Sequence, residues 1–556
     1  MVMGKSVKRV PVLIVGAGAG GLATSALLAK HGVASLLVEK RREVFIYPKA
    51  RNLSFRSSEI LRGLGVGGEV HAVAEHVSDM VVKPTLNSAV EALALDVGAI
   101  FADLVELSPE PAAQFCPQSR LEPILLTDTR RRGSDVRYGW ELSSFEQDDA
   151  GVTASVRDPD SGESETVRAD YLVAADGVHS PIRKMLGMTT SGSGPWPLFV
   201  VFVYFRAPWR RFVPHLGDGD GVQVKNPDVD GMFLVARDDL GMFATTYFPN
   251  RGETAAQFTP QRCRELILKA VGEPIDVEII EVAPWQPYEQ VVDQFQCGRV
   301  FFVGDSAHTM PPIKAGGANV AIQSAHNLAW KLAAVLNGRA GPELLSTYHT
   351  ERHPVGRFSA RQSCNGPQLD MLRMEDDSMR LPPEEECSMF TVLIGYQYRS
   401  AAVVTDEPVP ADPDAVSLVE ELRGQPGTRV PHAWVSRGGE RVSTLDLLGP
   451  GFTLFTGSDG PQWLSAAGAV STDLGVPITV RRIGGDSEIE DIKGRWAELA
   501  GLSPDAALLV RPDDFVAWRT SGLPPSPRDE LDRVLCQILG RPNACMTAGE
   551  LTEVRG

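Results

Sequence analysis

Three glycines and one acidic residue near the N-terminus have the types and spacing of a dinucleotide-binding motif. Gly16, Gly18 and Gly21 form a GxGxxG run, and Glu39 follows roughly 20 residues further on. The first glycine permits a tight turn, the second lets the backbone approach a pyrophosphate, and the third lets a helix pack closely on a strand. A carboxylate at Glu39 can accept hydrogen bonds from ribose hydroxyls and disfavours a 2′-phosphate. The four residues therefore predict an adenine-dinucleotide site in which NADP is disfavoured.

The segments around these residues have the pattern of the βαβ unit that such a motif requires. Residues 12–15 form a short β-branched and leucine run, residues 22–30 are rich in alanine and leucine, and residues 35–38 form a second apolar run. The N-terminus of the intervening helix would offer free N–H groups to phosphates. The alternative, a glycine-rich turn without a ligand, would not need a strand, a helix and an acidic residue at these places. Because FAD and NAD share the ADP half, the motif alone does not separate them.

Two further segments repeat the pattern of a strand that ends in a polar turn. Residues 170–187, DYLVAADGVHSPIRKMLG, place Asp176 in a turn after a strand. Residues 298–338 contain the run GDSAH, in which Asp305 closes a buried strand, and then a loop with paired prolines and paired glycines. From Val320 onward, apolar residues recur at helical spacing. Taken alone, GDSAH would be a strand followed by an ordinary polar turn.

The three segments together resemble the class A FAD-dependent aromatic hydroxylases, the p-hydroxybenzoate hydroxylase-like flavoprotein monooxygenases, in the same order along the chain. The runs PPIKAGGANVAIQSAHNLAWKL and LLSTYHTERHPVG are similar to the family's flavin-covering loop and its next helix. The run FCPQSRLEPILL resembles the segment whose glutamine, here Gln118, reaches the ribityl chain of the flavin. The C-terminal part looks like the thioredoxin-like tail of phenol and aromatic polyketide hydroxylases. The resemblance selects FAD as the bound cofactor.

The resemblance, together with the motifs, implies a set of cofactor contacts. Asp305 at its strand end can hydrogen-bond ribityl hydroxyls, and backbone N–H groups near Ala318 and Asn319 would meet the pyrimidine edge of the flavin, where the helix dipole favours negative charge on the reduced ring. The residues expected to contact the cofactor are Gly16, Gly18, Ala19, Gly21, Glu39, Lys40, Lys49, Gln118, Asp176, Asp305, Pro312, Gly317, Ala318 and Asn319.

The chain departs from the family pattern at two places. Lys49 stands where relatives usually carry an arginine that touches the pyrophosphate, and lysine supplies the charge without the bidentate fork. Arg51 or Arg56 could compensate. In the flavin-covering loop, Lys314 and Ala315 replace residues that are commonly glycines or aromatics.

The organisation of the chain predicts an α/β fold of several parts. Residues 1–190 and 287–365 would form a Rossmann-like FAD-binding domain, and residues 191–286, rich in Val, Phe and Tyr, an inserted antiparallel sheet for the substrate. The acidic, Pro-rich residues 366–423 would form a linker with some helix. Residues 424–556 would form the thioredoxin-like domain. Because this domain has no CxxC pair, we expect it to have a structural or dimer-stabilising role rather than a redox one.

Composition limits the partners. The formal net charge of −17 disfavours nucleic acid and anionic membranes, and no stretch is apolar enough to span a bilayer. Seven cysteines, without a CxxC pair or a histidine cluster at ligand spacing, predict a reduced cytoplasmic protein with no metal site. The basic N-terminus followed by apolar residues mimics a signal peptide, but the glycine cluster argues against one.

The implied chemistry is a monooxygenase cycle. NADH or NADPH would reduce the FAD, O₂ would give a C4a-hydroperoxide, and an aromatic or polycyclic phenolic substrate would receive one oxygen atom, in the tailoring of a polyketide or antibiotic. The resemblance implies that the nicotinamide donor visits the flavin transiently. No catalytic base is evident, and His308 and His326 are expected to be structural. The residues that could line the substrate pocket, or be ordinary core, are Tyr204, Tyr247, Trp285 and Tyr288.

Three alternatives stay open from the sequence. The same scaffold carries out Baeyer–Villiger insertion or other oxidative tailoring. It could also be a flavin-dependent dehydrogenase without oxygen transfer. A flavin-bound protein that sequesters a compound without turnover would belong to a different class altogether. The absence of a WxWxIP run argues against halogenation.

Overall fold

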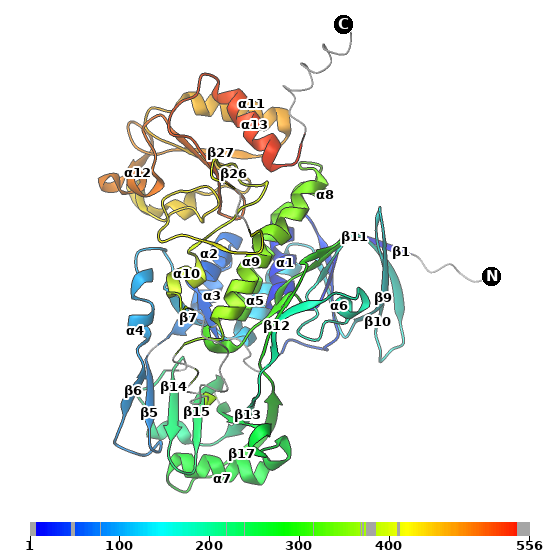
Figure 1. Ribbon diagram of the computed structural model, residues 1–556, viewed down its shortest axis with the longest axis vertical. Coiled ribbons are helices and arrows are strands. Elements are labelled where there is room, and N and C mark those ends of the chain that lie inside the picture. Colours follow the sequence, from blue (N-terminus) through cyan, green and yellow to red (C-terminus); the bar gives the residue numbers. More distant parts are fainter. Residues whose placement is uncertain are drawn as a thin grey trace, which may run out of the picture.

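The computed structural model describes residues 7–45, 51–77, 79–217, 219–237, 240–314, 316–366, 369, 372–373, 385–408 and 412–541. Three parts follow one another along its long axis (Figure 1). An antiparallel sheet with α7 lies at one end, a parallel sheet with long helices lies in the middle, and the C-terminal part lies at the other end. Within these ranges, no helix has both the length and the apolar character needed to cross a membrane.

The middle part is built on a mostly parallel sheet. β1 (Val7–Val15) lies between β11 and β2, and the residues of β1 that the sequence predicted as a buried strand have exposed fractions of 8% or less. This short apolar run is buried on both faces, as central parallel strands are. The other strands of this sheet are β2 (Ser35–Glu39), β8 (Asp135–Tyr138), β9 (Glu141–Asp148), β10 (Gly151–Arg157), β11 (Ser164–Ala174), β19 (Gln296–Cys297) and β20 (Val300–Phe302).

Helices cover this sheet. α1 (Ala19–Lys30) leaves β1 at the glycine run, and its small residues let it pack against α8 (Gly316–Leu336). α9 (Thr347–Gln362) lies beside α8 (Figure 1). The remaining helices of this part are α2 (Phe55–Leu64), α3 (Gly67–Val73), α4 (Val97–Ile100), α5 (Gln118–Arg131) and α6 (Pro181–Met185).

Two small sheets join the middle part to its neighbours. One consists of β3 (Asn52–Ser54), β7 (Ala113–Phe115) and β4 (Glu75–His76). The other consists of β12 (Thr190–Pro195), β18 (Tyr288–Val292) and β21 (His308–Thr309).

The seven-stranded sheet at one end has two different faces. Its order is β17-β13-β16-β15-β14-β5-β6, and all neighbours are antiparallel except β14 and β5. One face packs on α7 (Pro260–Val271) and the other faces the middle part (Figure 1). The strands are β17 (Glu278–Trp285), β13 (Phe199–Arg206), β16 (Leu240–Tyr247), β15 (Asp230–Arg237), β14 (Gly221–Lys225), β5 (Met80–Lys83) and β6 (Ala92–Leu95).

β5 and β6 belong to residues that the sequence analysis placed with the FAD-binding part. The structure pairs β5 with β14 through Val82 and Gln223, so a segment before residue 100 completes the inserted sheet. Such a pairing between distant segments leaves no local pattern in the sequence.

The C-terminal part contains a four-stranded sheet with helices on it. β26 (Phe452–Thr456) is parallel to β27 (Ile478–Arg482) and antiparallel to β29 (Ala507–Val510), which pairs with β30 (Val516–Arg519). α11 (Gln462–Leu474) and α13 (Pro527–Ile538) pack on it, which is the predicted thioredoxin-like arrangement. A second sheet contains β24 (Trp434–Arg437), β25 (Glu440–Ser443) and β28 (Ile489–Asp491), and α12 (Arg495–Ala500) follows.

The segment between the middle and C-terminal parts is more ordered than a linker needs to be. It contains α10 (Met389–Leu393) and the short pair β22 (Tyr396–Gln397) and β23 (Ser417–Leu418). Tyr396 and Tyr398 are buried in an aromatic cluster with Phe515. This stretch therefore packs between the two larger parts.

Candidate functional site

The three motifs that the sequence singled out converge at the end of the parallel sheet. A Cβ on Gly16 would lie 2.1 Å from the backbone oxygen of Ala175, and Gly16 has a φ of +110°. A Cβ on Gly20 would lie 3.7 Å from the Cα of Gly304 and 3.4 Å from the Cβ of Ala321. The glycine run, the turn at residues 175–177, the GDSAH run and the first turns of α8 therefore meet around one place.

The glycine run presents its backbone to this place. α1 begins at Ala19, and the N-cap residue Gly18 makes no side-chain cap, so N–H groups of the first turn are available to an anion. A Cβ on Gly18 would be 3.8 Å from Nε2 of Gln118, so Gly18 faces the start of α5. Gly21 touches Gly16, where a Cβ would be 1.9 Å from the backbone oxygen. Gly16 and Gly21 therefore lie at close backbone approaches that leave no room for a side chain, and Gly18 lies at the start of α1 with space beside it.

Glu39 ends β2 beside the glycine run. Its carboxylate is 6% exposed and accepts hydrogen bonds from the N–H groups of Ala17 (2.7 Å) and Arg41 (2.9 Å). These bonds fix the carboxylate beside the glycine run. Lys40 is exposed and follows directly.

Gln118, which the sequence indicated, forms a hydrogen bond with Glu122, which the sequence analysis did not single out. Gln118 starts α5, and its amide donates to the carboxylate of Glu122, one turn later on the same face of the helix. Glu122 is 1% exposed. The i, i+4 spacing of the two side chains was the available sequence signal.

Asp176 and Asp305 occupy turns with different tasks. Asp176 accepts hydrogen bonds from Ser180 Oγ (2.7 Å) and the Ile182 N–H (3.0 Å), which organises the start of α6. Burial raises the pKa of Asp176. Asp305 is exposed in the short helical turn after β20, and its backbone oxygen accepts a hydrogen bond from Thr309. The side chain of Asp305 is therefore exposed at the site. The side chain of Asp176 instead forms hydrogen bonds with Ser180 and Ile182, which follow it in the same loop and helix.

The start of α8 offers backbone rather than side-chain groups. A Cβ on Gly317 would meet nothing within 4 Å, and Gly317 and Ala318 are half-buried. Asn319 is 2% exposed, and its side-chain amide bonds Asn52 and Ser54 of β3. Pro312 is exposed in the short turn before the helix. The first turn of α8 thus has open space beside Gly317.

The cations that could neutralise a phosphate differ in their surroundings. Lys49 lies outside the described residues. Arg56 is committed, because its guanidinium donates to Glu59 (3.0 Å) and Asp514 (2.9 Å). Nε and Nη2 of Arg51 are buried without a hydrogen-bond partner in the described structure. Of the two arginines considered as compensation for Lys49, only Arg51 has uncommitted N–H groups.

Arg51 lies where the middle part meets the segment that leads into the inserted sheet. Its guanidinium carbon lies 4.8 Å from the centre of the Phe115 ring, against which Gly219 also packs. Burial lowers the pKa of Arg51 to about 10, and the charge of Asp220 opposes this shift. Asp220 is 7% exposed; its Oδ2 accepts from the Gly217 N–H, and its Oδ1 has no hydrogen-bond partner among the described residues. The charge of Asp220 therefore acts on Arg51, although no hydrogen bond or ion pair joins the two side chains in the described structure.

The four aromatic residues considered for a pocket do not share one space. Tyr204 is 3% exposed in a cluster with Leu234 and Met242 on the sheet face toward the middle part. Tyr247 lies on the opposite face, stacked on Phe199 at 4.9 Å in the α7 core. Alternation along β13 and β16 separates the two tyrosines.

Trp285 belongs to the same face as Tyr204, and Tyr288 lies further along the chain. The Trp285 ring lies 5.6 Å from that of Phe202, a neighbour of Tyr204 on that face. Tyr288 is half-buried in β18, opposite Pro195.

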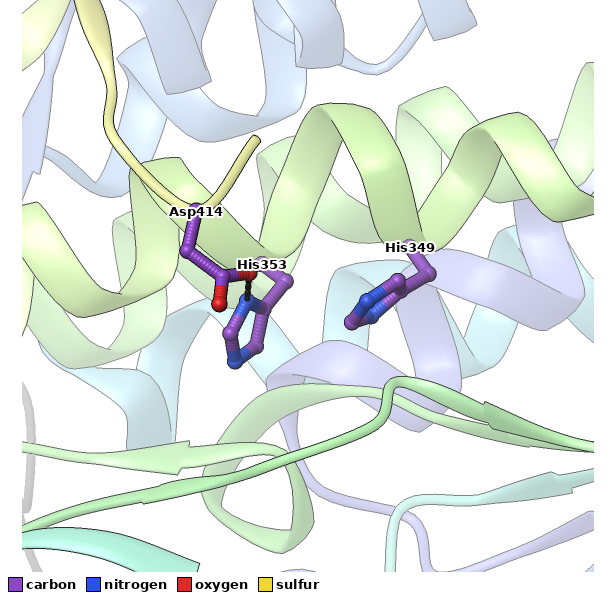
Figure 2. A group of neighbouring side chains, drawn as sticks. All are labelled: His349, His353 and Asp414. Carbon is purple, nitrogen blue, oxygen red and sulfur yellow. Dashed lines mark ion pairs between the residues drawn. The ribbon is translucent and has the colours of Figure 1, made fainter. Parts of the chain in front are cut away.

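One group of side chains among the described residues has the composition of a metal site. His349 and His353 lie one turn apart on α9, and Asp414 approaches them, with candidate ligand atoms within 4.8 Å of one another (Figure 2). However, Nδ1 of His349 accepts the N–H of Phe295 at 3.2 Å, so a neutral His349 carries its proton on Nε2. Asp414 also pairs with Arg357 at 3.7 Å. We therefore interpret these side chains as ion pairs between Asp414 and α9 rather than as a set of metal ligands.

Comparisons with known proteins place this geometry in a family. The FAD binding domain family matches residues 9–363, and the family described as aromatic-ring hydroxylase, C-terminal, matches residues 423–542. The chain is 38% identical to tetracenomycin A2 monooxygenase-dioxygenase of Streptomyces glaucescens, over 98% of this chain and 100% of that protein. It is 37% identical to 4-methyl-5-nitrocatechol 5-monooxygenase of a Burkholderia species, over 95% and 98% of the two chains.

A solved structure agrees with these matches. The crystal structure of aklavinone-11 hydroxylase in complex with FAD and aklavinone superposes with a TM-score of 0.85 at 34% identity, covering 96% of this chain and all of that one. The chain therefore belongs to the FAD-dependent aromatic hydroxylases of the aromatic polyketide hydroxylase type, with a thioredoxin-like C-terminal domain. It is an FAD-dependent monooxygenase, and the predicted family, fold class and bound cofactor are confirmed.

Proposed function

We propose that the protein uses NADH or NADPH and O₂ to hydroxylate an aromatic or polycyclic phenolic compound during the tailoring of a polyketide. The observation that carries the proposal is the convergence of the three motifs on the first turn of α8, in the part of the molecule toward which the apolar sheet face that bears Tyr204 is turned. The names of the relatives support this choice of substrate, since they include a tetracenomycin A2 monooxygenase-dioxygenase, a putative polyketide hydroxylase and an aklavinone 12-hydroxylase.

The residues of the chain fit FAD along the whole length of that cofactor. N–H groups at Gly18 and Ala19 would bind the pyrophosphate, and Glu39 would bind the adenosine ribose. Gln118 and Asp305 would hold the ribityl chain. The open space beside Gly18, which a larger residue would fill, supports this fit. Bound there, the flavin supplies the activation of oxygen for the hydroxylation.

The chain's own residues would orient the ring and the substrate. Backbone N–H groups at Gly317 and Ala318, at the positive end of the α8 dipole, would favour negative charge on the pyrimidine edge of the flavin. The side chain of Asn319 holds that turn in place from behind. On the other side, Phe202, Tyr204 and Met242 would exclude water and stack on an aromatic substrate.

We assign Arg51 and Asp220 to the polar end of the substrate rather than to a phosphate. A phosphate next to Asp220 would suffer repulsion from the carboxylate. A phenolic hydroxyl can donate to Oδ1 of Asp220 and accept from Nη2 of Arg51, both buried without a hydrogen-bond partner in the described structure. The two side chains would therefore hold the phenol oxygen and the proton that it carries.

We further propose a division of labour along the chain. Residues 1–190 and 287–365 bind FAD, residues 191–286 with β5 and β6 roof the substrate, and residues 424–556 form the tail. The reduced nicotinamide would reach the flavin transiently, because the other GxGxxG run, residues 63–68, connects α2 to α3 and does not follow a strand as a dinucleotide-binding motif does.

The test combines cofactor, electron donor and oxygen. Purified holoprotein should oxidise NADH or NADPH faster when a polycyclic phenol is added, and under ¹⁸O₂ the product should gain one labelled oxygen. A closely related compound that lacks the phenolic hydroxyl provides the control and should stimulate oxidation less. Product formation without label would point to a dehydrogenase, and label in a ring-expanded lactone would point to Baeyer–Villiger insertion; either result would refute hydroxylation.

A further inference from the structure

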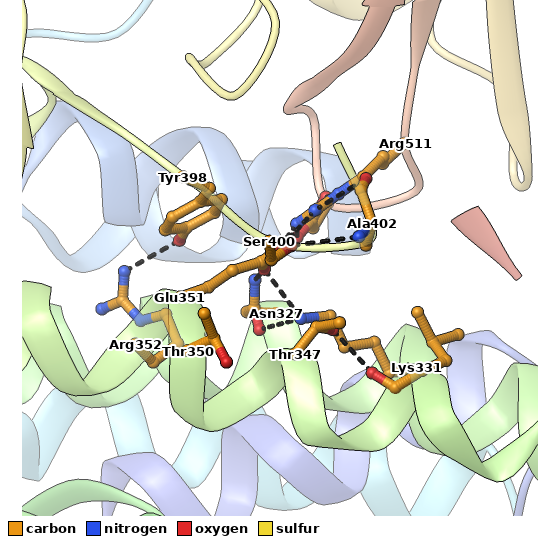
Figure 3. Close-up of polar contacts among 12 residues, drawn as sticks. Asn327, Lys331, Thr347, Thr350, Glu351, Arg352, Tyr398, Ser400, Ala402 and Arg511 are labelled. Carbon is orange, nitrogen blue, oxygen red and sulfur yellow. Dashed lines mark hydrogen bonds and ion pairs between the residues drawn. The ribbon is translucent and has the colours of Figure 1, made fainter. Parts of the chain in front are cut away.

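A cluster of buried charges joins the C-terminal domain to α8 and α9. Glu351 of α9 accepts hydrogen bonds from Arg511 Nη1 (2.6 Å) and Nη2 (2.9 Å) and from Lys331 Nζ (2.7 Å) (Figure 3). Arg511 also donates to both carboxylate oxygens of Asp513, at 2.9 and 2.6 Å. Glu351 and Arg511 are 1% exposed and Lys331 is fully buried. Three separate chain segments therefore meet in one closed network.

The network is balanced in charge and geometrically specific. Two cations, Lys331 and Arg511, oppose two carboxylates, Glu351 and Asp513. Although burial opposes ionisation of Glu351, the charges of Arg511 and Lys331 keep its pKa below the ordinary value. Asn327 of α8 bridges the two carboxylates, at 2.6 Å from Glu351 and 3.0 Å from Asp513. Buried ions tolerate few arrangements, so such a cluster fixes relative position more than it adds stability.

The hairpin loop that contains Arg511 also forms hydrogen bonds with α2. This loop comprises residues 511–514 between β29 and β30. Arg56 of α2 donates hydrogen bonds to the backbone oxygen of Asp513 (2.9 Å) and to Oδ2 of Asp514 (2.9 Å). Arg56 is 1% exposed and also contacts Nδ1 of His326 on α8 at 3.4 Å. The same four-residue loop thus holds α2 and α8 together.

α2 and α8 lead directly to the proposed flavin site. Ser54 precedes α2 by one residue, and Asn319 lies in the first turn of α8. The Ser54 N–H and hydroxyl both donate to Oδ1 of Asn319, at 3.0 and 3.2 Å. Arg56 is two residues from Ser54, so the hydrogen bonds between Arg56 and the loop lie close in the chain to the bond between Ser54 and Asn319.

We propose that the loop Arg511–Asp514 of the C-terminal domain is a positioning element for the flavin, because it sets the relative placement of α2 and α8 and thereby the direction of the N–H groups at the start of α8. The inference rests on the proposed placement of FAD against that first turn. It gives the tail a part in cofactor binding, in addition to the structural role that the sequence suggested. A small rotation of α8 would change how its N–H groups and dipole meet the flavin, and both affect the flavin's reduction potential.

The structure offers a matched pair of substitutions for the test. Asp514→Asn removes the charge that pairs with Arg56, and Asn suits the positive φ of +69° at that position. Asp446→Asn removes a more exposed pair between the C-terminal domain and α2, where Arg62 Nε and Nη2 lie 2.8 and 3.0 Å from the carboxylate. Arg62 lies in the last turn of α2, far along the helix from Ser54.

The readouts follow the flavin and the helix. FAD dissociation constants come from titration of apoprotein, reduction potentials from the holoprotein, and hydrogen exchange at residues 316–326 from the apoprotein. Asp514→Asn should weaken FAD binding about 2- to 30-fold, shift the flavin's visible spectrum and potential, and speed exchange at the start of α8. Asp446→Asn should leave all of these as in the wild type. Arg511→Met should act more strongly than Arg511→Lys, which retains the charge.

The inference is overturned if Asp514→Asn and Arg511→Lys bind FAD with the wild-type constant, spectrum and potential while only their melting temperatures fall. Equal flavin effects for Asp446→Asn and Asp514→Asn would also overturn it, since these would indicate general loosening of the interface. If Arg511→Met does not fold, the flavin properties of Asp514→Asn and Arg511→Lys decide whether the inference holds. Unchanged flavin properties in variants of an enzyme that still hydroxylates would reject this inference alone, whereas a wild-type protein that binds no FAD would reject the proposed function and this inference together.

Discussion

Gly20 of α1 lies against Gly304 of the GDSAH run, so closely that a Cβ on Gly20 would be 3.7 Å from the Cα of Gly304. The two residues are nearly 300 positions apart in the chain, yet their contact brings the glycine run and the strand-ending Asp305 to one side of the sheet. In the proposed function, this close approach would let one extended cofactor touch both segments. Substitutions around this contact should therefore separate effects on the fold from effects on the cofactor.

Gly16 and Gly18 should respond differently to a larger side chain. Gly16→Ala should destabilise the fold, by about 1–3 kcal/mol or more, because the Cβ would meet the backbone oxygen of Ala175 and φ is +110°. Gly18 has an extended backbone with φ −78° and room for a Cβ, so Gly18→Val should fold but bind FAD about tenfold or more weakly. Urea unfolding and FAD titration of both variants check this. Full retention of FAD by Gly18→Val would refute the assignment of the pyrophosphate.

Tyr204 and Tyr247 form a matched pair on opposite faces of the inserted sheet. Tyr204→Leu should raise the KM for a phenolic substrate about 2- to 10-fold, since it removes a stacking partner on the face toward the flavin. Tyr247→Leu should lower stability through loss of its stack on Phe199 and leave KM unchanged. Steady-state kinetics with thermal melting distinguish the two. The reverse outcome would place the substrate on the α7 side of the sheet.

Arg51 and Asp220 should affect the substrate and not the cofactor. Arg51→Met should lower kcat/KM for a phenol about 10- to 150-fold, because a charge-assisted hydrogen bond contributes about 1.5–3 kcal/mol. Asp220→Asn should act in the same direction. FAD content and the FAD dissociation constant of both variants should match the wild type. Weaker FAD binding by Arg51→Met with unchanged KM would instead assign Arg51 to the pyrophosphate, in compensation for Lys49.

The buried ring of His308 should make the protein sensitive to mild acid. Burial lowers the pKa of His308 to about 3, from an ordinary value of 6.5. The unfolded chain therefore binds the proton first as pH falls, so the stability that depends on neutral His308 is present above pH 6.5 and is lost progressively between 6.5 and 3. Between pH 6.5 and 5 this one group should lower the free energy of unfolding by about 2 kcal/mol.

His308→Gln isolates that contribution. Urea unfolding at several pH values should give the variant a shallower fall of stability below pH 6.5 than the wild type. Parallel pH profiles for the two proteins would show that His308 does not carry the effect.

Local sequence determined the pieces of this protein that depend on neighbouring residues. The run at residues 12–15 specifies a buried strand, because it is continuously apolar, and Gly16 with its positive φ specifies the turn that follows. The spacing from Gly16 to Glu39 follows from the length of one βαβ unit. Those local rules predicted an adenine-dinucleotide site. The resemblance of the three motifs to a known family then gave the family and FAD, both of which the comparisons confirm.

Tertiary structure decided what depends on contacts between distant segments. Alternation in β16 does not reveal which face meets α7, so the sequence could not place Tyr204 and Tyr247 on opposite sides. Nor do single arginines show their partners: the fold commits Arg56 to Asp514 and leaves N–H groups of Arg51 uncommitted. A side chain's partners are set by packing across the whole chain, whereas strands, turns and glycine cradles are set by the residues beside them.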